Sequence, residues 1–341
     1  MSSKKGINIA DVRGKLYSQK TNGTNPFIEG ANKICQIKEF KTSLGKERLH
    51  KGILNVVSIS LPSLKDAVAH ENKEAFPFKH RVYTYSSDYK EWLFDEFKRS
   101  LTVAVEKYNA HVICINELGM PVNNRGIVDS KAIKFAKQLA DKHNCLIIAG
   151  SNHSRDKYTN VGYIFYPGTD DTNEKYKMFY KNVSAFQTPE PELLFTPSER
   201  VVHFTKAFGV GFSFLICLEI ADFSSAAAIV SNTDNIDFLI VPAYLNTYGP
   251  MEKTALKISH ALGGVLLNNC YMSKDLPISR LYLNGKIYGN DTNRKENPRS
   301  EPTRIVLRKV NVTEFLNTKD DNKFHMPDEL KYLFNSKNRP V

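Results

Sequence analysis

The chain has 341 residues, of which 41% are hydrophobic, and a formal net charge of +11 at pH 7. That length accommodates one large α/β core with extensions. The sequence contains no stretch of eighteen apolar residues, no apolar signal-peptide core at its N-terminus, and no Cys-x-x-Cys pair among its five cysteines. These features argue against a membrane span, a secretory leader, a disulfide framework and a zinc finger, and we expect a soluble cytoplasmic protein that does not bind membranes.

The basic excess lies mostly at the N-terminus. Residues 1–51 are polar and irregular, and they carry eleven Lys or Arg against four Asp or Glu. We expect a basic extension over 1–51, one domain over 52–312 and a C-terminal tail over 313–341. The pI near 9.2 is compatible with binding a polyanion. However, the charges are interspersed and few aromatic residues lie among them, so nucleic acid is the less favoured partner.

The first half of the domain alternates between strand and helix patterns. Residues 52–61 predict a strand that ends at Pro62, and residues 63–85 predict an inserted loop or short helix. The elements expected next are a helix from residue 86 with an apolar face from Leu93 to Tyr108, a strand at 111–116, a helix at 129–143 and a strand at 145–149.

The second half continues the alternation. Strands are expected at 161–166, 176–180, 212–217, 238–241, 265–268 and 303–310, and helices near 224–230, 251–262 and 328–334. Strands that alternate with helices predict a layered α/β architecture.

A cysteine ends the apolar run at 212–217. That run is typical of a buried central strand, and the Glu-Ile-Ala-Asp segment after Leu218 is typical of the entry to a helix. A thiol at such a turn lies beside free backbone N–H groups and the positive end of a helix, which stabilise a thiolate and bind an oxyanion. Cys217 is therefore a candidate nucleophile, and the N–H of Leu218 is a candidate oxyanion donor.

Two charged residues also follow apolar strands. Glu117 comes after the strand at 111–116, and Lys181 comes after the strand at 176–180. Functional groups gather at the carboxyl ends of strands in open α/β sheets, so both side chains can meet Cys217. A thiol near its ordinary pKa needs a base, and acyl transfer needs a cation near the developing negative charge. Glu117 and Lys181 fit these two roles.

These segments resemble the nitrilase, or carbon-nitrogen hydrolase, superfamily, whose active site holds Glu, Lys and Cys in that chain order. The resemblance spans about residues 52–312 and rests on the strand-end Glu117, on Lys181 in Lys-Met-Phe-Tyr-Lys, and on Cys217 before Leu-Glu. It implies a four-layer α-β-β-α sandwich. It also implies that Cys217 attacks, that Glu117 is general base and then acid, and that Lys181 stabilises the tetrahedral intermediate, with no metal or organic cofactor.

The resemblance further implies a second glutamate that supports the lysine, shortly before an aromatic-x-Pro segment that here is Phe-Thr-Pro at 195–197. Glu192 is our choice, and Glu190 is the alternative. Leu218 replaces the usual aromatic residue after the cysteine, and Asn182 replaces the common residue after the lysine. Reactive residues retained in changed surroundings predict an unusual substrate, and amide, nitrile and carbamoyl compounds all stay open.

Each of these residues also has a structural interpretation. A cysteine in an apolar strand is usually a small buried hydrophobe, and we expect this of Cys114 and Cys145. A lone Glu or Lys at a strand end is usually a solvated residue. His203 lies fourteen residues before Cys217 and allows a Cys–His hydrolase, although no motif supports that alternative.

Two functional hypotheses result. In the first, the protein is a thiol hydrolase of non-peptide carbon–nitrogen bonds that forms a thioester or thioimidate with a small amide or nitrile. In the second, the same fold is a catalytically weak or silent binding module of a larger nucleic-acid-associated or defence-related assembly. Retention of all three reactive residues favours the first. Subunits of this superfamily commonly pair, so the resemblance implies a homodimer or larger homo-oligomer.

Overall fold

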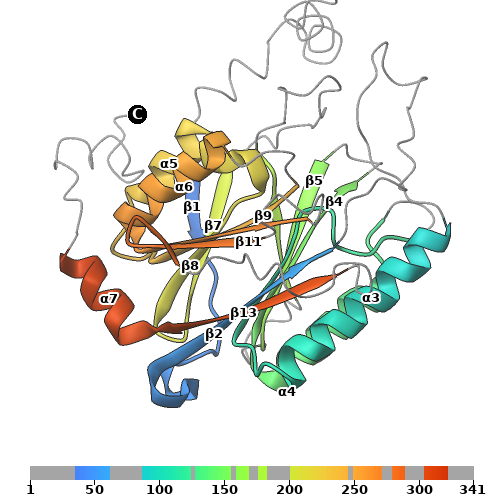
Figure 1. Ribbon diagram of the computed structural model, residues 1–341. Coiled ribbons are helices and arrows are strands. Elements are labelled where there is room, and N and C mark those ends of the chain that lie inside the picture. The colour runs from blue at the N-terminus through green and yellow to red at the C-terminus, as the bar shows by residue number, and fades with distance from the viewer. Residues whose placement is uncertain are drawn as a thin grey trace, which may run out of the picture.

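The protein is built from two β-sheets that pack face to face, with helices on both outer sides (Figure 1). The computed structural model describes residues 35–61, 87–123, 127–154, 159–168, 176–182, 200–244, 249–270, 279–288 and 303–321. Contacts between β2 and β10, β3 and β9, and β6 and β7 hold the two sheets together. The four-layer α-β-β-α architecture expected from the sequence is therefore confirmed.

One sheet has six strands in the order β13-β2-β3-β4-β5-β6. Its strands are β2 (Ile53–Ser60), β3 (Val112–Ile115), β4 (Leu146–Ser154), β5 (Thr159–Phe165), β6 (Lys177–Tyr180) and β13 (Arg304–Asn311). Strands β2, β3 and β4 run parallel, whereas β5, β6 and β13 are antiparallel to their neighbours. The parallel strands therefore end at the same edge of the sheet.

The other sheet has seven strands in the order β1-β7-β8-β9-β10-β11-β12. Its strands are β1 (Gln36–Glu39), β7 (Val201–Ala207), β8 (Val210–Phe214), β9 (Phe238–Ala243), β10 (Gly264–Asn269), β11 (Ser279–Leu283) and β12 (Lys286–Tyr288). The central strands β8, β9 and β10 are parallel and buried along their whole length. Burial on both faces explains their continuous apolar sequences.

Helices α3 (Ser87–Glu106) and α4 (Ser130–His143) lie on one outer side, and α5 (Phe223–Val230) and α6 (Gly249–Leu262) lie on the opposite side (Figure 1). A further helix, α7 (Val312–Asp321), follows β13. Helix α4 begins where the Asp129 side chain accepts the Lys131 N–H at 2.8 Å, which is a typical N-cap. Within the described ranges, no helix has both the length and the apolar character needed to cross a bilayer.

Alternation along the strands separates two apolar cores. Val56, Val112 and Leu146 form a cross-strand row that packs between the sheets. The residues that follow each of them in sequence point to the other face, where they pack with α3 and α4 in a second cluster. Each sheet therefore has one face against the other sheet and one face against helices.

An asparagine connects the two sheets near the carboxyl ends of β10, β2 and β3. The side chain of Asn268 on β10 donates to the carbonyls of Ile59 and Cys114, at 2.9 and 2.8 Å, and accepts from the Ser60 hydroxyl at 3.0 Å. Asn268 is fully buried, so these bonds replace water for every polar atom of its amide. They fix β10 relative to β2 and β3.

The structure also corrects the sequence predictions. The strand predicted at 212–217 is wrong at its end, because β8 stops at Phe214 and Cys217 has φ 54°, which no strand accommodates. The irregular structure expected over 1–51 is wrong for its described part, where β1 pairs with β7. Strands β11 and β12 and helix α7 were not predicted. The loop expected at 63–85 and the helix expected at 328–334 lie outside the described residues.

The predicted domain limits at residues 51 and 312 stay predictions. On the described part of the chain, both outer segments contribute to the core. Phe40, just after β1, and Phe315, on α7, are 6% and 4% exposed. Phe315 packs against Phe238 of β9 with ring centroids 6.0 Å apart.

Candidate active site

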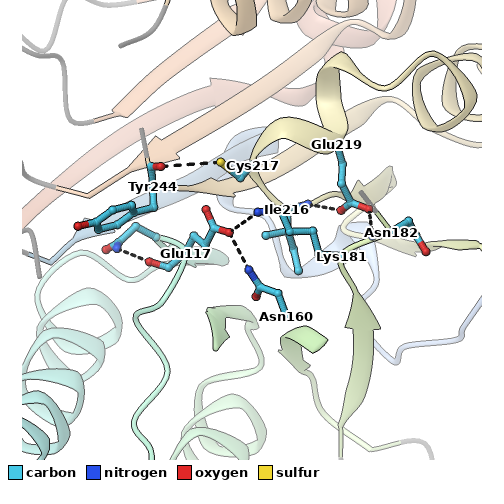
Figure 2. Close-up of polar contacts among 9 residues, drawn as sticks. Glu117, Asn160, Lys181, Asn182, Ile216, Cys217, Glu219 and Tyr244 are labelled. Carbon is cyan, nitrogen blue, oxygen red and sulfur yellow. Dashed lines mark hydrogen bonds and ion pairs between the residues drawn. The ribbon is translucent and has the colours of Figure 1, made fainter. Parts of the chain in front are cut away.

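Three charged or nucleophilic residues meet where strands of the two sheets end (Figure 2). Glu117 follows β3 and Lys181 follows β6, so both come from the six-stranded sheet. Cys217 follows β8 of the seven-stranded sheet. All three side chains are buried, at 3%, 2% and 3% exposure respectively. Face-to-face packing of the sheets thus brings together residues that are a hundred positions apart in the sequence.

Glu117 and Lys181 form a buried ion pair. Lys181 Nζ lies 2.8 Å from Glu117 Oε1. The amide of Asn160 donates to the same oxygen at 2.7 Å. Asn160 and Lys181 are themselves paired across β5 and β6, because the Lys181 N–H donates to the Asn160 carbonyl at 2.8 Å. Two adjacent strands therefore direct two donors to Oε1, and Oε2 accepts neither of them.

Cys217 begins a tight turn of 3-10 helix, η3 (Cys217–Ala221). Its φ of 54° lies in the left-handed region, where an L residue other than Gly costs roughly 1–3 kcal/mol. The thiol contacts the backbone carbonyl of Tyr244 at 3.9 Å. The sulfur is directed to the Tyr244 carbonyl, and the Glu117 carboxylate lies on the same side of the turn (Figure 2).

Burial raises the pKa of the Cys217 thiol well above its usual range, and the nearby Glu117 carboxylate raises it further, while the Lys181 ammonium lowers it. The resting thiol is therefore protonated at neutral pH. A protonated thiol is a weak nucleophile and must pass its proton to a base before it attacks. Glu117 is the carboxylate in position to accept that proton.

A second buried carboxylate lies within η3. Glu219 accepts the N–H of Ile216 at 2.7 Å and the N–H of Asn182 (Figure 2). Burial raises its pKa to about 7, although both N–H bonds and the Lys181 charge act in the opposite direction.

The structure thus brings Glu117, Lys181 and Cys217 together. Leu218 is the second residue of η3 and is half-buried. Glu190 and Glu192 lie outside the described residues.

His203 lies on β7 opposite Lys38, where burial and two lysines lower its pKa to about 4. The contacts and charges described for Cys217 involve Glu117, Lys181 and Tyr244 instead. Cys114 and Cys145 are fully buried, Cys114 in the apolar cluster between the sheets and Cys145 in the cluster that packs with α3 and α4. Burial raises the pKa of the Cys145 thiol to about 12, which makes it unreactive at neutral pH.

Sequence reasoning assigned no role to Asn160, Tyr244 or Glu219. Glu219 carried a signal, because it lies two residues after the cysteine in the motif itself. Asn160 is the second residue of β5 and belongs to no recognisable motif, and Tyr244 contributes its backbone carbonyl, which no side-chain pattern reveals.

The sequence matches no described protein family and no curated protein. The structure is similar to Nit3 of Saccharomyces cerevisiae, a member of branch 10 of the nitrilase superfamily. The TM-score is 0.56 at 13% identity, over 81% of this chain and 97% of that one. A carbon-nitrogen hydrolase from Helicobacter pylori G27 gives a TM-score of 0.55 at 13% identity, over 80% of this chain and 94% of that one.

A mutant of the amidase from Nesterenkonia sp. AN1 gives a TM-score of 0.52 at 11% identity, over 79% of this chain and 95% of that one. In that protein, the acetamide moiety of fluoroacetamide is attached covalently to the active-site cysteine. At these identities the likeness shows the fold. The chain has the fold of the nitrilase superfamily, and the resemblance seen in the sequence is confirmed at that level.

Proposed function

We propose that the protein is a divergent nitrilase-superfamily enzyme, a thiol hydrolase of non-peptide carbon–nitrogen bonds in small amides, nitriles or carbamoyl compounds. The observation that carries the proposal is the buried Lys181–Glu117 contact beside a cysteine held at positive φ. An unpaired buried charge is costly, and a strained residue persists only where its surroundings enforce it. Such features concentrate at catalytic sites.

In the first half-reaction with an amide, Glu117 Oε2 accepts the thiol proton as Cys217 Sγ bonds to the carbonyl carbon. The carbonyl oxygen becomes an oxyanion, stabilised by the Lys181 ammonium and the Leu218 N–H. The carbon–nitrogen bond then breaks, Glu117 returns its proton to the leaving nitrogen, and ammonia or an amine departs. A thioester remains on Cys217; a nitrile gives a thioimidate instead.

In the second half-reaction, water attacks the thioester while Glu117 accepts one of its protons. The carbon–sulfur bond breaks, the acid leaves, and the proton returns to the thiolate. Lys181 and Asn160 both donate to Glu117 Oε1. We therefore assign to Oε2 both the acceptance and the return of the proton. From the family resemblance, we assign the support of Lys181 to Glu192, with Glu190 as the alternative.

The other properties proposed for the enzyme come from the same resemblance and from the composition of the sequence. We place it in the cytoplasm, as a homodimer or larger homo-oligomer that needs no metal or organic cofactor. The basic segment 1–51 stays assigned as an extension of the catalytic domain, over 52–312, with 313–341 as a tail.

The test measures ammonia release from acetamide, propionitrile and N-carbamoylglycine, one compound of each class. Wild type should turn over at least one of them, and Cys217→Ala should lower kcat at least about 1,000-fold. Cys145→Ala is the matched control, since it removes a buried thiol from the core of the same domain and should leave kcat within about threefold.

Intact-protein mass spectrometry during turnover supplies the second readout. It should show an acyl adduct on wild type that is absent from Cys217→Ala. Turnover by Cys217→Ala at the wild-type rate would remove the cysteine from the mechanism. Failure of wild type on all three compounds, with no adduct, would favour the accessory binding module.

A further inference from the structure

Glu219 is a buried acidic side chain that the proposed reaction does not use. It is 1% exposed and lies two residues after Cys217. Carboxylates are rarely buried to this degree unless their oxygens have strong partners, because removing a charge from water is costly. The position of its partners therefore indicates what it does.

Those partners lie on both sides of the site. One oxygen accepts the N–H of Ile216, the residue immediately before Cys217, at 2.7 Å. The other oxygen accepts the N–H of Asn182, the residue immediately after Lys181. The Glu219 N–H donates in turn to the Ile216 carbonyl at 3.2 Å. One carboxylate thus joins the end of β6, in one sheet, to the turn after β8, in the other (Figure 2).

The bridge requires the ionised form of the side chain. An ionised carboxylate is an acceptor at both oxygens, which suits two N–H donors. A protonated acid accepts only weakly at the oxygen that carries the proton, and a glutamine carries an amide donor in that place. Either change weakens or breaks one of the two bonds of the bridge. Glutamine therefore imitates the protonated state of Glu219.

We infer that Glu219 is a positioning residue whose ionised carboxylate holds Cys217 in register with Lys181. The inference rests on the proposed function. The φ of 54° at Cys217 makes the bridge necessary, because a strained turn relaxes when its restraints are removed. A displacement of about 1 Å at a reacting atom lowers a rate by about 100-fold.

Protonation of Glu219 falls in an accessible pH range. Burial raises the pKa of Glu219 to about 7, although the nearby Lys181 ammonium acts in the lowering direction. Helix α5 and strand β9, which pack on η3, contain no titratable residues. The titratable residues of the third packed element, α6, are Glu252, Lys253, Lys257 and His260. Glu252 is paired with Arg280, and Lys181 with Glu117.

The experiment compares kcat of wild type and Glu219→Gln from pH 5.5 to 8.5, on the compound of the three-member panel that wild type hydrolyses. The rate of Cys217 alkylation by iodoacetamide, located by mass spectrometry, is measured in parallel and needs no substrate. The expected kcat ratio of wild type to variant is about 100 at pH 8.5, with KM changed less than about threefold. The ratio should fall to about 4 at pH 5.5, where most of the wild type is itself protonated at Glu219.

Glu96→Gln is the matched control, because Glu96 is a carboxylate with 8% exposure on α3 that pairs with Arg99 away from the site. Its ratio to wild type should stay near 1 at every pH. If Glu219→Gln does not fold, Glu219→Asp takes its place; it keeps the charge but shortens the bridge, so kcat should fall about tenfold and still rise with pH as wild type does.

The outcomes separate the two proposals. A wild type that hydrolyses none of the panel overturns the proposed function, while the alkylation ratio still tests the bridge. An active wild type with a ratio that is constant with pH, or near 1 throughout, overturns the role of Glu219. A constant ratio is the result expected if Glu219 only stabilises the fold.

Discussion

Two buried lysines show how the same side chain serves different purposes in this molecule. Lys319 on α7 is 6% exposed, and its ammonium donates to the carbonyls of Thr233 and Ile236 and pairs with Asp237. Lys181 is 2% exposed and pairs with Glu117 beside a thiol. Two partners of Lys319 are backbone carbonyls, which do not titrate, and the third, Asp237, takes no part in the proposed reaction, so Lys319 is a fixed anchor for α7. Glu117 is titratable, so the field around Lys181 changes whenever a proton moves.

The largest expected effect separates these lysines directly. Lys181→Met should lower kcat at least about 1,000-fold, because it removes the cation from the oxyanion and leaves Glu117 buried without its partner. It should also lower the free energy of unfolding by about 3–5 kcal/mol. Lys319→Met should destabilise by a similar amount and leave kcat of the folded enzyme within about threefold. Urea unfolding and steady-state kinetics measure both; equal losses of kcat would break the comparison.

The second effect concerns stability as a function of pH. The folded-state pKa of Glu219 is raised from 4.5 to about 7, so its favourable contribution is fully present below pH 4.5 and is lost as the pH rises through 7. The loss amounts to about 3 kcal/mol of unfolding free energy. Glu219→Gln should abolish that slope in urea titrations at pH 5, 6, 7 and 8. A variant with the wild-type slope would assign the titration to another group.

A smaller effect is expected at Asn160, which shares Glu117 Oε1 with Lys181. Asn160→Ala should lower kcat about 10- to 100-fold, because the carboxylate loses one of the two donors that orient it. Asn55→Ala is the matched control: its amide also donates inside the six-stranded sheet, to the carbonyls of Tyr108 and Asn109, near the start of β2. The control should keep kcat. An active Asn160→Ala would show that Lys181 alone orients Glu117.

The smallest effect tests the strain at Cys217. Cys217→Gly should be more stable than Cys217→Ala by about 1 kcal/mol, because Gly adopts positive φ without a steric penalty. The order should reverse at Cys145, which does not have positive φ and where Gly should be less stable than Ala by about 0.5–1 kcal/mol. Urea unfolding of the four variants gives both differences. The same order at both positions would refute strain at the turn.

The sequence predicted the layers because buried helices and strands carry apolar residues at regular spacing. Leu93, Phe97 and Leu101 recur at helical spacing on α3 and are fully buried, and β9 is a continuous apolar run because both its faces are covered. Strands at the edge of a sheet show this apolar pattern less clearly. Strand β1 is polar and mostly exposed, and all three residues of β12 are exposed, so neither has the apolar run or the alternation that marks a buried strand.

The site was predictable where side-chain identity and strand ends coincide, as at Glu117 and Lys181. The site was not predictable where backbone N–H or carbonyl groups make the contacts. Neither the N–H of Asn182 nor the carbonyl of Tyr244 has a sequence signature, because every residue carries these groups. The early end of β8 was hidden for a different reason: Leu215 and Ile216 are as buried as strand residues but lie between β8 and η3.

The division of the site between two sheets has a consequence for synthesis of the chain. Glu117 and Lys181 emerge from the ribosome before Cys217. However, β2 pairs with β3 along one edge and with β13 along the other, and β13 ends at Asn311, long after Cys217. The cross-sheet bonds of Asn268 also form late, because β10 follows all three reactive residues. The nascent polypeptide therefore carries its thiol well before the base can be locked opposite it. Chemical competence is therefore acquired only after β13 has been synthesised and has paired with β2.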